Sequence, residues 1–92
     1  MSIHKLKTIN PYFQDVWDGK KTFDLRLNDD GRDYKVDDVL ILEEYDEKIN
    51  VLTGRRIFAK VPYILSGKPW LSDGYVCMSL SVFRKNDVCN DD

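Results

Sequence analysis

The feature that most limits how this chain can fold is a short alternating segment, residues 22–27, that follows a glycine. Apolar side chains alternate there with polar ones, at Phe23, Leu25 and Leu27. A period of two predicts a strand with one buried apolar face and one polar face. On the polar face Asp24 and Arg26 lie two residues apart, which is roughly 7 Å along a strand. The segment therefore predicts an acid and a cation held side by side on one strand face.

A short amphipathic helix is predicted just before this strand. Asn10 and Pro11 predict its start. Asparagine caps helices well, and a proline at the first helical position lacks only an N–H that would have no partner within the helix. Gly19 predicts its end, because glycine readily adopts the left-handed conformation that follows a helix. Four apolar residues share one stripe, for which core packing is favoured over a stacking surface: Tyr12, Phe13, Val16 and Trp17.

Alternating apolar residues predict further strands on both sides of this unit. Residues 1–9 predict a first strand, and residues 39–45, which begin apolar on both faces, predict a central one. Residues 55–66 predict one long strand in which Pro62 marks a bulge or an edge position, because proline cannot donate to a ladder. Residues 75–84 predict a last strand. Its inward side chains are expected to be Val76, Met78, Leu80 and Val82.

Residues 19–26 read Gly-Lys-Lys-Thr-Phe-Asp-Leu-Arg and resemble the G-x-K-x-x-[E/D]-x-R signature of ASCH domains, which belong to the PUA-like superfamily of small β-barrels. Other stretches resemble the DUF3850 branch of that group: residues 4–7, 11–13, 32–36, 42–46, 53–55 and 74–76. The resemblance extends from His4 to Val82. It implies an α+β fold, a small mixed β-barrel of about five to six strands with one or two short helices.

One turn departs from the family pattern. Asp37 stands where relatives carry a glycine, inside a predicted tight turn at residues 36–38. Aspartate tolerates the left-handed conformation better than most residues, so we expect the turn to be kept under some strain.

The resemblance also implies a ligand cleft between the helix and the barrel, lined by Lys21, Asp24 and Arg26. A nucleobase or nucleoside suits such a cleft, because a carboxylate can accept ring N–H or amino groups and lysines can meet phosphate oxygens. Without the resemblance, a surface salt bridge between Asp24 and Arg26 would explain the same residues.

Further candidate ligand contacts lie around this segment. Lys7, Lys20 and Arg32 are candidate phosphate contacts, and each is equally well explained as a solvated surface charge. Tyr75 and Trp70 are candidate stacking partners for a base, although simple packing is the more economical explanation for both.

An enzyme is the alternative to a binding domain. Some bacterial ASCH proteins, similar to this chain in the signature, are amidohydrolases that remove acetyl from N4-acetylcytidine, and they imply a threonine nucleophile, an activating lysine and a carboxylate. Lys21 matches the lysine, but Asp24 fills the threonine position and cannot act as a hydroxyl nucleophile. We therefore assign no catalytic residue, and Lys21 and Asp24 are the candidates only under this alternative.

Length and charge narrow the function classes. A chain of 92 residues predicts one domain, at residues 1–85, followed by a polar tail at 86–92. The net charge of −2 argues against a protein that coats nucleic acid nonspecifically. Many cations nevertheless fall in the first third of the chain, where they can form a local basic rim: Lys5, Lys7, Lys20, Lys21, Arg26, Arg32 and Lys35.

The remaining residue types predict an ordinary cytoplasmic domain. Cys77 and Cys89 are expected to be reduced thiols. His4 is the single histidine and is expected to be a hydrogen-bonded structural residue. With no C-x-x-C or H-x-x-x-H spacing, neither a metal nor a cofactor is expected. No apolar run approaches the roughly 18 residues of a membrane span, so no membrane association is expected.

Three hypotheses about function stay open at this point. The first is an RNA- or modified-nucleotide-binding domain that uses the cleft. The second is hydrolysis of an acylated nucleoside such as N4-acetylcytidine. The third is a protein-interaction module, for instance an accessory protein of a mobile genetic element.

Overall fold

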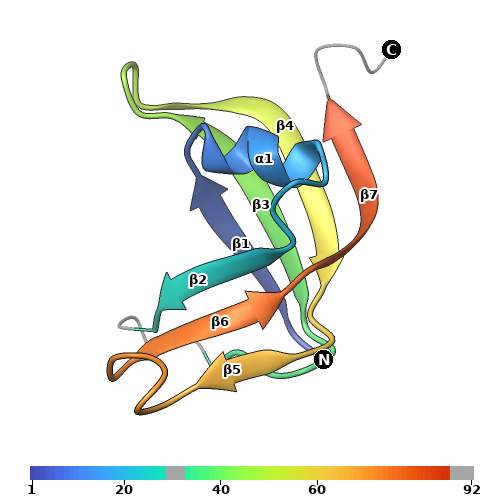
Figure 1. Cartoon of the computed structure of the whole chain (residues 1–92). Coiled ribbons are helices and arrows are strands. Elements are labelled where there is room, and N and C mark those ends of the chain that lie inside the picture. The colour runs from blue at the N-terminus through green and yellow to red at the C-terminus, as the bar shows by residue number, and fades with distance from the viewer. Residues whose placement is uncertain (29–32, 88–92) are drawn as a thin grey trace.

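The structure is a computed structural model that describes residues 1–28 and 33–87. In chain order the described elements are β1 (Ile3–Thr8), α1 (Tyr12–Trp17), β2 (Phe23–Leu27), β3 (Val39–Asp46), β4 (Val51–Lys60), β5 (Ile64–Ser66), β6 (Tyr75–Ser79) and β7 (Ser81–Asp87). The strands form a four-stranded sheet, β1-β3-β4-β7, and a three-stranded sheet, β2-β6-β5. Figure 1 shows α1 in front of the larger sheet, with the smaller sheet crossing below the helix.

The expectation of an α+β β-barrel is wrong. The two sheets are separate hydrogen-bonded units and do not close into a barrel. Within residues 1–28 and 33–87, α1 is the only helix, and it has six residues. The protein is therefore mostly β-sheet. In this described part of the chain it has two sheets and one short helix that packs against them.

The chain passes from one sheet to the other at two points that the sequence pattern does not reveal. Residues 61–63 separate β4 from β5, and Leu80 separates β6 from β7. The periodicity predicts one continuous strand in each place, because apolar alternation continues across the break. Pro62 ends the ladder instead of forming a bulge within it, as a residue without an N–H can.

The core lies between α1 and the inner face of the larger sheet. Its buried members come from both sheets, the helix and the connection between β4 and β5: Leu6, Phe13, Val16, Leu40, Leu42, Ile57, Val61 and Met78. β3 is central, with β1 parallel on one side and β4 antiparallel on the other. The expectation that residues 39–42 form a central strand is confirmed, since all four are buried.

The helix begins and ends almost where the sequence predicts. Pro11 is the N-cap in place of Asn10, so the helix begins one residue later than expected, and the Asn10 side chain accepts a hydrogen bond from the Gln14 backbone N–H at 3.0 Å. Gly19 has φ +79° and its N–H donates to the Val16 carbonyl at 3.1 Å, which confirms the left-handed helix end.

The apolar stripe of α1 is only partly core. Phe13 and Val16 are buried, as expected, and Trp17 is half-buried against them. Tyr12, in contrast, is exposed. Its ring therefore lies outside the core, next to the fully buried Phe13 in sequence, and lines a surface feature described below.

Asp38 organises the end of the molecule where the chain begins. Its carboxylate accepts hydrogen bonds from the Ser2 and Lys35 backbone N–H groups, each at 2.9 Å, and lies 2.9 Å from Nε2 of His4. Burial acts to raise the pKa of Asp38, but these hydrogen bonds together outweigh it and hold the pKa below its ordinary value. His4 is thus a hydrogen-bonded structural residue, as expected.

The turn next to Asp38 keeps the strain predicted for it. Asp37 has φ +74°, and its N–H donates to the Val61 carbonyl at 2.8 Å. We expect Asp37→Gly to raise the free energy of unfolding by up to about 1 kcal/mol, because glycine adopts this conformation without a Cβ clash. Urea denaturation measures the change. Asp37→Ala is the matched control and should destabilise; stabilisation by both variants would contradict a backbone cause.

Candidate ligand-binding cleft

β2 is turned over relative to the sequence prediction. Its apolar side chains point outward, with Phe23 47% and Leu25 48% exposed, whereas Asp24 is only 5% exposed. The pairing explains the inversion, because Asp24 lies opposite Met78 of β6, a fully buried core residue. Neighbouring residues across a ladder share one face of the sheet. The strand therefore presents its charged residues to the interior and its hydrocarbon residues to solvent.

Arg26 compensates the buried carboxylate and joins the two sheets. Its Nε donates to Oδ2 of Asp24 at 2.7 Å. Its Nη1 donates to the Lys7 carbonyl at 3.1 Å, and its Nη2 donates to Oγ1 of Thr8 at 3.0 Å. Lys7 and Thr8 belong to β1, on the free edge of the larger sheet. One guanidinium thus connects the edge strands of both sheets.

Lys21 approaches the same carboxylate from the other side. Its Nζ lies 3.5 Å from Oδ1 of Asp24 and donates to the Phe23 carbonyl at 2.6 Å. The ammonium also lies 4.8 Å from the centroid of the Phe23 ring. Each oxygen of Asp24 therefore has a cation as its neighbour, which is what a carboxylate removed from water requires.

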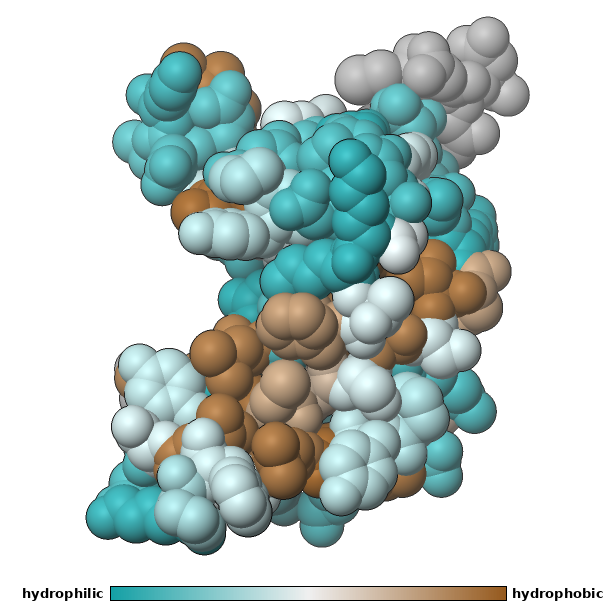
Figure 2. Space-filling model, in the orientation of Figure 1, coloured by the Kyte–Doolittle hydropathy of each residue, from teal (hydrophilic) through white to brown (hydrophobic). Residues whose placement is uncertain are grey.

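These residues form the floor of a cleft of about 590 Å³ between the end of β1, the start of α1 and β2. This volume lies within the range of ordinary small-molecule sites. In Figure 2 the molecule is hollowed at its left edge, above the hydrophobic area that covers the smaller sheet. The cleft is lined by Lys7, Thr8, Ile9, Tyr12, Lys21, Phe23, Asp24, Leu25 and Arg26.

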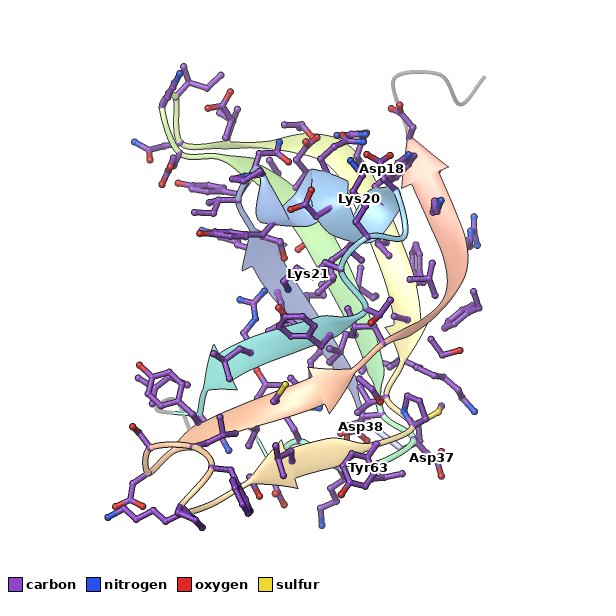
Figure 3. All side chains as sticks on the ribbon, viewed as in Figure 1. Asp18, Lys20, Lys21, Asp37, Asp38 and Tyr63 are labelled. Atoms are coloured by element: carbon purple, nitrogen blue, oxygen red, sulfur yellow. The ribbon has the colours of Figure 1, made fainter. Side chains whose placement is uncertain are left out.

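The structure brings together some of the residues predicted to contact a ligand and separates others. Lys7, Lys21, Asp24 and Arg26 line the cleft. Figure 3 shows Lys20 beside Asp18 at the outer side of α1, whereas Lys21 lies between α1 and β2.

The other predicted contacts lie elsewhere. Tyr75 pairs with Leu27 on the outward face of the smaller sheet. Trp70 is exposed in the connection between β5 and β6. Arg32 lies outside the described residues.

Sequence reasoning missed the apolar part of the cleft. The sequence pattern places Tyr12, Phe23 and Leu25 in the core and gives no functional role to Thr8 and Ile9, yet all five line the site. One signal was present: a strand whose polar face carries matched opposite charges can bury that face. Binary patterning alone favours the opposite orientation, because it assigns hydrocarbon to the interior.

A second polar cluster, also missed, ties α1 to the larger sheet. Arg55 donates through Nε and Nη2 to the two oxygens of Glu44, at 2.9 and 2.7 Å, and through Nη2 to Oε1 of Gln14 at 2.7 Å. Its guanidinium lies 4.7 Å from the centroid of the Trp17 ring. The cluster holds the helix that forms one wall of the cleft, so its role is structural.

The same cluster sets the ionisation of Glu44. The hydrogen bonds from Arg55 are the largest cause, and together with those from Thr53 and Asn10 they outweigh the effect of burial and lower its pKa from 4.5 to about 2. The carboxylate therefore stays charged well into the acid range.

Removing Arg26 should leave Asp24 buried and uncompensated. We expect Arg26→Ala to lower the free energy of unfolding by about 3 kcal/mol, the usual consequence of breaking a buried ion pair from one side. The double variant Asp24→Asn, Arg26→Ala should recover part of this loss, because no buried charge remains. Chemical denaturation of the two single variants and the double variant measures the coupling; strictly additive losses would contradict it.

Glu44 should make stability depend on acid pH. Its folded-state pKa lies below its ordinary value, so its contribution is complete above about pH 4.5 and is lost as pH falls toward 2. The contribution is about 3 kcal/mol at neutral pH. Glu44→Gln should therefore be clearly less stable than the parent at pH 7 and should differ little from it near pH 2. A stability difference that does not change with pH would contradict this.

Two general features hold for residues 1–28 and 33–87. None of the helical structure there is long and apolar enough to cross a membrane. No group of three or more histidine, cysteine, aspartate or glutamate residues is arranged there to hold a metal ion. Cys77 carries a free thiol, and Cys89 lies outside the described part of the chain.

Comparison with known proteins relates the chain to a protein family and to a phage protein. Residues 3–80 match the family model described as a domain of unknown function, DUF3850. A protein of Escherichia phage P2, described as an uncharacterized 12.9 kDa protein in the GpA 3′ region, is 37% identical over 71 residues, which cover 77% of this chain and 62% of the phage protein. The chain spans less than two thirds of that relative's length. On the match over residues 3–80, the chain belongs to the DUF3850 family.

Proposed function

We propose that this chain is an ASCH-type member of the PUA-like superfamily that binds RNA or a modified nucleotide, with one base seated in the cleft. The observation that carries the proposal is the composition of the cleft. Aromatic and aliphatic side chains, Tyr12, Phe23 and Leu25, surround a floor of one carboxylate and its cations. A planar, partly apolar ligand that bears N–H donors and a negative charge matches both parts.

The floor of the cleft can still accept hydrogen bonds from a ligand after its contacts within the protein are made. An ionised carboxylate offers about four lone-pair sites, and Asp24 uses one for the hydrogen bond from Arg26, while Lys21 lies 3.5 Å away. A base N–H or amino group can therefore still be accepted. Lys7 and Lys21 supply positive charge for a phosphate group, and the rings of Tyr12 and Phe23 supply surfaces on which a base can pack.

Hydrolysis of an acylated nucleoside stays a prediction with weaker support. Among the described residues that line the cleft, Thr8 carries the only aliphatic hydroxyl, and its Oγ1 accepts a hydrogen bond from Arg26. Within the described part of the chain, this hydroxyl donates to the Leu6 carbonyl and has no hydrogen-bonded base that would activate it. Chromatography of N4-acetylcytidine after incubation with the protein separates hydrolysis from binding.

The third hypothesis, an accessory protein of a mobile genetic element, also stays a prediction. The match to a phage protein favours such an origin. A role in protein interaction would be independent of the cleft, so pull-down partners that resist nuclease and the Lys21→Ala and Arg26→Ala substitutions would support it.

Two adjacent lysines provide a matched test of the proposal. A panel of nucleosides and nucleotides should shift the NMR amide signals of residues 20–26, and Lys21→Gln should weaken the binding of the best nucleotide at least about fivefold, because a charge near the ligand is lost. Lys20→Gln, an identical change at a residue outside the cleft, should leave affinity within about twofold.

Two results would refute nucleotide binding in the cleft. One is a panel, including single-stranded and structured RNAs, in which no member shifts these signals. The other is an equal loss of affinity in both lysine variants. The amide spectrum of each free variant serves as the control for folding.

A further inference from the structure

The outer face of the larger sheet, the side away from α1, forms a second charged surface. Alternation and register define it. Leu6, Leu42 and Ile57 lie side by side in the buried core, so their chain neighbours point the other way. The central row of this outer face runs across all four strands through Lys5, Ile41, Phe58 and Arg84.

The outer face is strongly basic although the chain as a whole carries a net charge of −2. The register places five cations on it: Lys5, Lys7, Arg56, Lys60 and Arg84. In the described segment of β3 from Val39 to Glu43, only Glu43 places a carboxylate on this outer face. Such segregation of charge favours a polyanionic partner.

Aromatic rings lie among these cations. The guanidinium carbons of Arg56 and Arg84 lie 5.7 and 5.4 Å from the centroid of the Phe58 ring. The Phe83 ring lies next to Phe58, with centroids 6.4 Å apart and planes tilted by 51°, and Phe83 is 59% exposed. Arginine planes and exposed rings on the face of a sheet are surfaces on which unpaired bases stack.

We propose that this outer face binds single-stranded nucleic acid, with phosphates on the cations and a base on Phe83. A single strand is favoured over a duplex because a duplex hides the faces of its bases, which leaves an exposed phenylalanine without a partner. A membrane surface would use the cations but would give no reason for arginines packed against an aromatic ring.

The surface goes beyond the proposed nucleotide cleft but is continuous with it. Lys7 lies on β1, an edge strand of the larger sheet, and it also lines the cleft. Its ammonium lies 4.7 Å from the centroid of the Tyr45 ring, at the border of the two surfaces. A single-stranded nucleic acid that places one base in the cleft can therefore continue over this edge of the sheet onto the outer face.

Fluorescence anisotropy with labelled oligo(U) and oligo(dT) tests the proposal. The double variant Arg56→Gln, Arg84→Gln should bind at least about tenfold more weakly at low salt, and the slope of log affinity against log salt should fall by about 1 to 2, because phosphate contacts are lost. The matched control is Lys48→Gln, Lys68→Gln, with charges in the β3–β4 and β5–β6 connections. It should change affinity less than about twofold.

A pair of exposed aromatic residues tests stacking. Phe83→Ala should weaken binding about tenfold, whereas Tyr63→Ala, a 65% exposed ring in the connection leading to the smaller sheet, should have no effect. Figure 3 shows Tyr63 at the lower end of the molecule beside β5.

Several results would overturn the proposal. The first is that the parent protein binds no oligonucleotide. The second is that the test and control variants lose affinity equally. The third is that the parent binds a duplex of the same sequence as tightly as the single strand while Phe83→Ala leaves affinity unchanged. Loss of binding in Lys21→Gln with the outer-face variants unchanged would also overturn it, since the cleft alone would then bind. If mononucleotides fail to shift residues 20–26 while the outer-face variants lose oligonucleotide affinity, the cleft function fails and the outer face stands.

Discussion

The cleft exists because one guanidinium joins the edge strands of two sheets. Arg26 neutralises a carboxylate that β2 turns into the interior and, through its other nitrogens, holds the end of β1. A buried aspartate without these bonds would destabilise the fold by several kcal/mol. The charged floor is therefore a condition of folding, and the ligand site that we propose uses residues that the fold already requires.

This structural role limits the contacts that the proposed ligand can make there. The donors of Arg26 are largely committed to protein acceptors, so a ligand meets Asp24 at its remaining lone pairs and meets Lys21 and Lys7 as charges. Much of its contact must come from the hydrocarbon walls, which β2 provides because its apolar residues face outward. Inversion of the strand thus creates both halves of the cleft, the ionic floor and the apolar mouth.

Sequence reasoning located most elements but not their partners. The helix end at Gly19, the buried central strand and the left-handed Asp37 follow from local chemistry, which is visible in a few consecutive residues. The division into two sheets depends on where ladders end, and Leu80 carries no mark of such an end. The orientation of β2 was predicted wrongly, because it depends on Arg26 reaching residues 18 and 19 positions away. Arg55 and Gln14, 41 positions apart, meet only once the fold exists.

The two places where the chain changes sheet lie side by side. The Ser79 N–H donates to the Tyr63 carbonyl, and the Leu80 N–H donates to the Thr22 carbonyl just before β2. The first of these hydrogen bonds links the two crossings directly to each other. The hydrophobic core contains Met78 from the smaller sheet and Ile57 from the larger one. Neither layer is an autonomous module. The strands of the two sheets also alternate along the sequence, so no single cut of the chain separates one sheet from the other, and the two sheets are expected to unfold together.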